Sequence, residues 1–171
     1  MAVVTTTYAT STAITLGLHA TPLASSPTFV LGRESTQIDN TTNKYIDAIV
    51  HGRTTVGTTP TTATLILCYV WGADDSLGTT ALDVLDGTDS DETFNNVEIL
   101  QSGLRLAASI SVIATDSNVT YYFAPFSVAS LFGGVMPKYW GLYVSHNTGV
   151  ALNSTAGNHV FKYTGITYTS T

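Results

Sequence analysis

Alternation of apolar and polar residues is the main pattern along this chain. In Leu104–Ile113 every second residue from Leu104 to Val112 is apolar, which assigns this series to the inward face. In Lys44–Arg53 the same spacing places three apolar residues on one face, Ile46, Ala48 and Val50. Because successive side chains of a β-strand point to opposite faces of the sheet, these stretches predict strands with one buried face.

Two segments depart from simple alternation. The run Ala63–Trp71 is apolar at nearly every position. Such a strand is covered on both faces, by a second layer of the same chain or by another subunit. Gly72–Asn96 follows; it holds three glycines and most of the acidic residues, and we expect it to be the longest loop. Phe126–Phe132, which comes directly after Pro125, is the one stretch that predicts a helical turn.

Turn signals recur about every ten residues, which predicts eight to ten short strands and an all-β fold. The remaining predicted strands are Thr28–Leu31, Val119–Phe123, Lys138–His146, Gly149–Asn153 and Asn158–Tyr168. The length favours a two-sheet jelly-roll sandwich of eight strands over a seven-stranded immunoglobulin type, which needs about 100 residues. We expect one jelly-roll domain over residues 27–171, preceded by an extended N-terminal arm or edge strand over residues 1–26.

Composition changes the picture of the surface. The chain contains 30 threonines but only 6 Lys and Arg and 12 Asp and Glu residues, so charged residues make up 11%. About 25% is usual in soluble domains. Threonine suits a pleated sheet surface because its branched Cβ already restricts χ1. We expect hydroxyl groups to cover most of the exterior, with wide neutral areas that are typical of subunit contacts; adequate solvation by hydroxyls and amides is the plainer alternative.

Charge argues against two classes of partner. The net charge is −6, and the six basic residues are scattered along the chain. Without a basic stripe to neutralise phosphates, we expect no direct binding to nucleic acid. Nor does the sequence predict attraction to an anionic membrane surface, and no apolar run approaches the 18 residues of a membrane span. The N-terminus has no basic segment followed by an apolar one, so we expect no secretion signal.

Residues with catalytic or ligand-binding potential are few. Cys68 lies inside the apolar run and is expected to be a small buried side chain. The four histidines are far apart, and no nucleophile elbow or phosphate-binding loop is present, so we expect no enzyme activity and no cofactor. The acidic stretch 83–92 is the best ligand candidate, with Asp86, Asp89 and Asp91 as possible Ca²⁺ ligands. Its spacing does not match the helix-loop-helix calcium loop, and a solvated acidic loop is the alternative.

Aromatic residues form a second candidate set. The four that we single out as interface residues are Trp71, Tyr139, Trp140 and Tyr143, and Tyr121 and Tyr122 belong with them as rings able to stack on sugars. A sugar-binding platform is one interpretation. The other is packing and subunit contact, in which the ring is buried and the hydroxyl stays in water.

The second half of the chain resembles one known family. The segments that carry the resemblance are 86–90 (DGTDS), 103–110 (GLRLAASI), 123–134 (FAPFSVASLFGG), 136–142 (MPKYWGL) and 146–152 (HNTGVAL). They are similar to segments of the jelly-roll cement, or decoration, proteins on the heads of tailed bacteriophages. The resemblance covers about residues 30–165 and brings no catalytic residue with it.

This resemblance implies a structural virion protein on the capsid exterior. Its partners would be the major capsid protein and two further copies of itself, in a homotrimer that bridges neighbouring capsid subunits and stabilises the shell by binding only its assembled form. The first 26 residues would be an arm reaching across those subunits. The alternative is a glycan-binding or host-adhesion module on the head or tail surface, which recognises cell-surface sugars.

Overall fold

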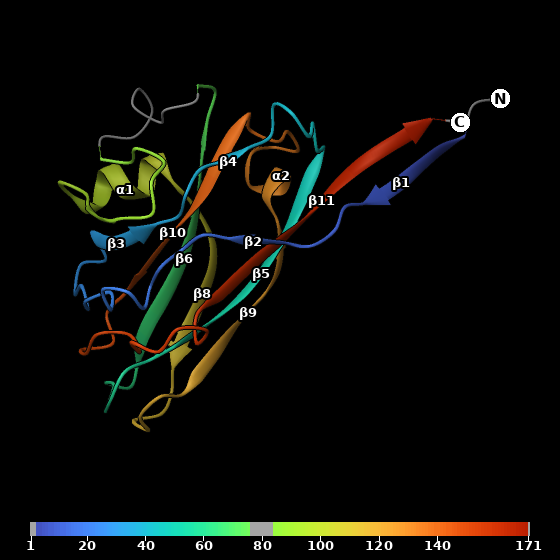
Figure 1. Cartoon of the computed structure of the whole chain (residues 1–171). Helices are drawn as coiled ribbons and strands as arrows, with labels where there is room; N and C mark the ends of the chain where they lie inside the picture. Colours follow the sequence, from blue (N-terminus) through green and yellow to red (C-terminus); the bar gives the residue numbers. More distant parts are fainter. Residues whose placement is uncertain (1–2, 76–83, 171) are drawn as a thin grey trace.

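Two antiparallel β-sheets packed face to face form the body of the protein (Figure 1). The computed structural model describes residues 3–75 and 84–170. Sheet A has the order β1-β11-β5-β9, with β2 also paired to β11; its strands are β1 (Val4–Tyr8), β2 (Thr12–Ile14), β5 (Asp47–Thr55), β9 (Thr120–Ser127) and β11 (Val160–Ser170). Sheet B has the order β7-β3-β10-β6-β8, with β4 paired to β10; its strands are β3 (Leu31–Glu34), β4 (Ile38–Asp39), β6 (Thr64–Ala73), β7 (Asp91–Thr93), β8 (Arg105–Val112) and β10 (Tyr139–His146).

Strand pairing follows a nested order. The first strand region, β1 and β2, pairs with the last strand, β11, and the next region, β3 and β4, pairs with β10. Inside these, β5 pairs with β9 and β6 with β8. The chain is therefore folded like one long hairpin rolled into two sheets, which is the jelly-roll topology. The prediction of an all-β, two-sheet jelly roll is confirmed.

The main core lies between the two sheets. It contains Val50 and Phe161 from sheet A, Val70 and Trp140 from sheet B, and the Trp140 ring meets Tyr163 edge-on at 5.4 Å between centroids. Within residues 3–26, β1 and β2 pair with β11 at the edge of sheet A, and three buried leucines then add to this core, Leu16, Leu18 and Leu23.

The other face of β6 has its own cover. Leu67, Tyr69 and Trp71 belong to a second cluster, packed beneath Phe94 and Leu100 from the segment that follows residue 83. This segment contains β7 and helix α1 (Val97–Gly103), which the sequence analysis did not predict. Of the two alternatives for the doubly apolar strand, a second layer of the same chain is thus the correct one.

Two local predictions are wrong and one is close. Leu106 was expected to face inward but is 49% exposed, because a β-bulge between the pairs Cys68–Ala108 and Tyr69–Leu106 adds one residue to β8 and reverses the direction of its side chains. The strand predicted at Gly149–Asn153 is reduced to an isolated bridge at Leu152. The predicted helical turn is present as α2 (Val128–Leu131).

Candidate functional site

The aromatic candidates are mostly core residues. Trp140 and Tyr143 are 0% exposed and Trp71 is 1% exposed, so none of these three can stack on a sugar or contact a partner at the surface. The interface and sugar-stacking roles predicted for these three residues are wrong, and their packing inside the protein is the correct interpretation. The reason is that the side chains of β6 and β10 alternate between two covered faces. Tyr139 is partly buried, and its interface role stays a prediction. Tyr122, by contrast, is 68% exposed on β9.

The acidic segment is held by one arginine. Arg33 on β3 contacts Asp89 through Nε at 2.8 Å and Asp91 through Nη1 at 3.0 Å. The Asp89 carboxylate also accepts the Gly17 backbone N–H at 2.9 Å. These bonds tie the N-terminal segment, β3 and the acidic segment together. Two of the three predicted Ca²⁺ ligands are therefore engaged in ion pairs, and the structure does not bring the predicted set together as a site.

The third predicted ligand, Asp86, lies in a different group of carboxylates. Ligand atoms of Glu34, Asp86 and Glu92 lie within 4.8 Å of one another, and Glu34 is fully buried. Its two carboxylate oxygens accept the backbone N–H groups of Asp86 at 3.1 Å and Gly87 at 3.0 Å. Burial, with smaller contributions from the nearby charges of Asp86 and Glu92, raises the pKa of Glu34 to about 8.

These three carboxylates lie close enough together to contribute to a cation site, but we assign no metal to them. Ca²⁺ takes six to eight oxygen ligands. The group supplies three carboxylates, and both oxygens of Glu34 already accept backbone hydrogens. Its evident role is to fasten the acidic segment over β3. Sequence reasoning included Glu92 in the acidic candidate stretch but did not connect Glu34 with it, because Glu34 lies some fifty positions before the residues it meets.

Two of the histidines join loops to the core. His146 is fully buried, with Nε2 donating to the Leu23 carbonyl at 3.0 Å, and burial lowers its pKa to about 4. His159 has Nδ1 2.7 Å from the Thr54 hydroxyl and Nε2 2.8 Å from the Asn153 carbonyl, and burial lowers its pKa as well. Both rings are therefore neutral at pH 7. Cys68 is buried, and burial raises the pKa of its thiol to about 12, as expected for a packing residue.

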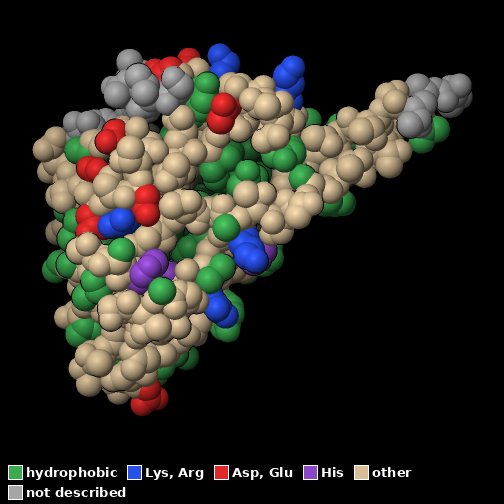
Figure 2. All heavy atoms as spheres, viewed as in Figure 1, with side chains coloured by type: hydrophobic (Ala, Val, Ile, Leu, Met, Phe, Trp, Pro, Cys, Tyr) green, Lys and Arg blue, Asp and Glu red, His purple; other side chains and the backbone are tan. Residues whose placement is uncertain are grey.

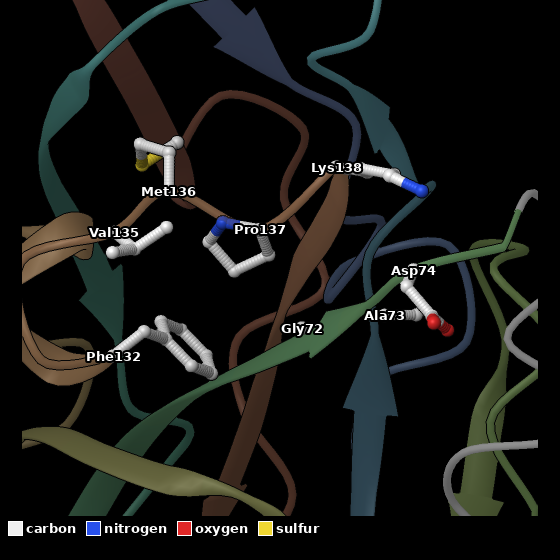
Figure 3. Close-up of a pocket in the computed structure, with 8 residues that line it drawn as sticks. All are labelled: Gly72, Ala73, Asp74, Phe132, Val135, Met136, Pro137 and Lys138. Carbon is white, nitrogen blue, oxygen red and sulfur yellow. The ribbon is translucent and has the colours of Figure 1, made fainter.

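A hollow of about 420 Å³ lies between α2 and the neighbouring ends of β6 and β10. Figure 3 shows its apolar side, where Phe132, Val135 and Pro137 lie together. The two charged residues at its edge, Asp74 and Lys138, point away from that apolar group (Figure 3). The hollow thus offers apolar contact but no convergent set of polar groups.

Both ends of the described chain run out of the body as one two-stranded ribbon (Figure 1). We call this the terminal ribbon; it consists of Val4–Tyr8 paired with Ile166–Ser170. All five residues of β1 are exposed, and β11 makes its last pair with β5 at Ile166. The ribbon therefore has two free edges, one along β1 and one along the end of β11.

The two faces of the terminal ribbon differ in chemistry. In its register one face carries Val4, Tyr8, Ile166 and Tyr168 with Thr6 and Ser170 between them, and the side chains of Val4, Tyr8 and Tyr168 are 65%, 66% and 62% exposed. The opposite face is made of threonines, at positions 5, 7, 167 and 169. Figure 2 shows hydrophobic side chains along one side of this projection. Such a face is unfavourable in water and indicates a contact surface.

Comparisons with known proteins gave no match: no family model, no curated protein and no solved structure matches this chain. Within the described residues, no helix is both long and apolar enough to cross a lipid bilayer.

Proposed function

We propose that this chain is a structural virion protein, a decoration (cement) protein that trimerises on the exterior of a tailed-phage head and bridges neighbouring major capsid subunits. Two observations support it together: the sequence resemblance to the cement proteins and the jelly-roll fold. Since one fold hosts many functions, the fold alone would be weak support.

The terminal ribbon is the observation that carries the proposal. A two-stranded ribbon is marginally stable at best in water without further packing. Here it also leaves Val4, Tyr8 and Tyr168 more than half exposed, away from the body. Its free edges can add a strand from a partner, and its apolar face can lie on a partner surface. Both features suit an arm that grips neighbouring shell subunits, and the ribbon gains stability only when it is bound.

Surface chemistry gives further support. In the view of Figure 2 few charged side chains are exposed, and the chain contains 30 threonines against 18 charged residues. Desolvating hydroxyl groups costs less than desolvating unpaired charges, so such a surface is suited to close contact with other subunits. A closed trimer would repeat one heterologous contact around a three-fold axis.

The experiment measures binding to phage heads and the solution mass. The purified chain is mixed with expanded, empty heads of the phage that encodes it and with unexpanded heads, and bound protein is measured after sedimentation. We expect saturable binding to expanded heads only, a higher melting temperature for decorated than for undecorated heads, and a light-scattering mass three times the 18.1 kDa chain mass.

A pair of variants tests the role of the ribbon. Replacing Val4, Tyr8 and Tyr168 together by serine removes the apolar face, and should weaken head binding by about a hundredfold or more if that face is desolvated. The matched control replaces Thr5, Thr7 and Thr169 by serine on the opposite face and should bind almost normally. The proposal would be contradicted if the chain were a monomer that does not bind to heads. It would also be contradicted if both variants bound to heads equally well.

A further inference from the structure

The outer face of sheet A carries a shallow groove of about 410 Å³. We call it the cationic groove; it is lined by His51, Gly52, Arg53, Tyr122, Val160 and Lys162 from β5, β9 and β11. Its volume lies in the range of small-ligand sites, about 300–1,000 Å³. Three adjacent strands build its floor, so the lining residues stand on a rigid part of the fold.

Strand register places the functional side chains next to one another. Arg53 on the central strand β5 is paired with Tyr122 on one side and Val160 on the other. Two residues earlier, His51 is paired with Lys162. Directly opposed residues have their Cβ atoms about 5 Å apart. Two cationic groups, an imidazole and an exposed phenol ring therefore share one small area.

The charge of this groove is opposite to that of the whole molecule. The chain has six Lys and Arg residues and a net charge of −6, yet two of those six stand in the groove. Figure 2 shows basic and histidine side chains along β11 and β5, with no acidic side chain between them in that view. In the described part of the chain, the ion pairs within 4 Å are both made by Arg33, so Arg53 and Lys162 keep their charge available.

We propose that the cationic groove binds an anionic carbohydrate, a sugar that carries a carboxylate or a sulfate group. Arg53 and Lys162 would hold the anionic group by charge-assisted hydrogen bonds, Arg53 through the part of its guanidinium not donating to the Gly157 carbonyl. The exposed Tyr122 ring would pack against the apolar face of the sugar ring. This role is separate from head binding, which the terminal ribbon carries.

Charge and size favour a sugar over the other anionic partners. A nucleic acid would bring many phosphates to a molecule of net charge −6 that offers only two full charges in the groove, so its affinity would be low. A protein partner needs about 800 Å² of contact on each side for stable binding, which a groove of this size does not provide by itself. A free inorganic anion would make no use of Tyr122 or of most of the volume.

The test follows NMR signals of the full chain during titration with four probes. These are sialyllactose, a sulfated heparin disaccharide, neutral lactose and an oligoglutamate peptide. We expect saturable shifts at the groove residues with one or both anionic sugars, a dissociation constant in the millimolar range, and weaker binding at higher salt. The two anionic probes distinguish carboxylate from sulfate recognition. Lactose should leave the groove signals unchanged.

Variants separate the groove from general charge. Arg53→Gln and Lys162→Gln should each weaken binding at least about tenfold, which corresponds to the loss of one charge-assisted bond. Tyr122→Ser should weaken sugar binding while leaving the net charge unchanged. Lys44→Gln removes an exposed charge outside the groove and is the matched control; it should bind normally.

Three results would overturn the inference. These are no saturable shift with either anionic sugar, tighter binding of oligoglutamate than of both sugars, and equal loss of binding in the Lys44→Gln control. The serine variant of the ribbon face should bind sugar like the unaltered chain, so a failure of head binding and a failure of sugar binding can be told apart.

Discussion

Glu34 gives the sharpest test of the electrostatics inside this fold. It is fully buried, and burial with the neighbouring Asp86 and Glu92 charges raises its pKa to about 8 from an ordinary value of 4.5. The folded protein thus keeps a proton that the unfolded chain releases above pH 4.5. The contribution of this group to stability is complete below pH 4.5 and is lost as pH rises through 8.

One pH window isolates this contribution. Burial lowers the pKa of His146, to about 4 from 6.5, and also that of His159, so both side chains add a rise in stability that levels off about one pH unit above 6.5. Between pH 6.5 and 8 Glu34 should lower the free energy of unfolding, and its contribution is the difference between the unaltered chain and Glu34→Gln, because both proteins contain the two histidines. The limiting slope is about 1.4 kcal/mol per pH unit, so the loss over this window is about 2 kcal/mol.

The assay is urea unfolding followed by tryptophan fluorescence at several pH values from 6.5 to 8. Protein concentration is held fixed, because assembly would otherwise change the apparent stability. We expect the free energy of unfolding of the unaltered chain to fall across the window. Glu34→Gln cannot ionise and should show no fall across the window, starting about 1 kcal/mol lower because its amide accepts only one of the two backbone N–H groups of Asp86 and Gly87.

Glu98→Gln is the matched control for this prediction. Glu98 is exposed on α1, and its replacement should keep the slope of the unaltered chain. A level profile in the unaltered chain would refute the reasoning, since it would mean that Glu34 is ionised in the folded protein at pH 6.5. An equal fall in the free energy of unfolding of Glu34→Gln would refute it as well, because another group would then be responsible.

Three further predictions concern packing and ion pairs, each measured by urea unfolding at pH 7. Asp89→Ala should cost about 2–3 kcal/mol, because it leaves the 12%-exposed Arg33 side chain without its closest partner. Gly141→Ala should cost about 1–3 kcal/mol and alter tryptophan fluorescence, since its added Cβ would lie 2.6 Å from the Trp71 ring. Trp140→Ala should cost about 3–5 kcal/mol, whereas an interface residue would alter assembly with little loss of monomer stability.

The fold class could be predicted from the sequence because apolar and polar residues alternate along several strands. Strand β5 follows the pattern closely, and the apolar run of β6 correctly indicated cover on both faces, which β10 shares. Helix α1 also left a signal that was overlooked: Asn96 accepts the Ile99 N–H at its start, and Leu100 and Leu104 are spaced four apart. The acidic, glycine-containing stretch before it hid this signal.

The remaining features depend on contacts that no local pattern records. One additional residue in β8 turns the side chain of Leu106 to the opposite face of the sheet. A β-bulge of this kind has no dependable signature in a single sequence. The aromatic set failed for a related reason. Whether Trp71 is buried or exposed depends on a layer that includes Phe94 and Leu100, more than twenty positions away. The cationic groove is a product of register, which brings Lys162 beside His51 across more than a hundred residues.

The position of β11 has a consequence for how the polypeptide matures. This strand is made after the other strands of the two sheets, yet it lies inside sheet A, between β1 and β2 on one side and β5 on the other. Sheet A cannot close until β11 has been synthesised, so the earlier strands leave the ribosome with their apolar sides uncovered. Such distant pairings fold slowly, on the scale of milliseconds to seconds, and leave time for chaperones or for association between nascent chains.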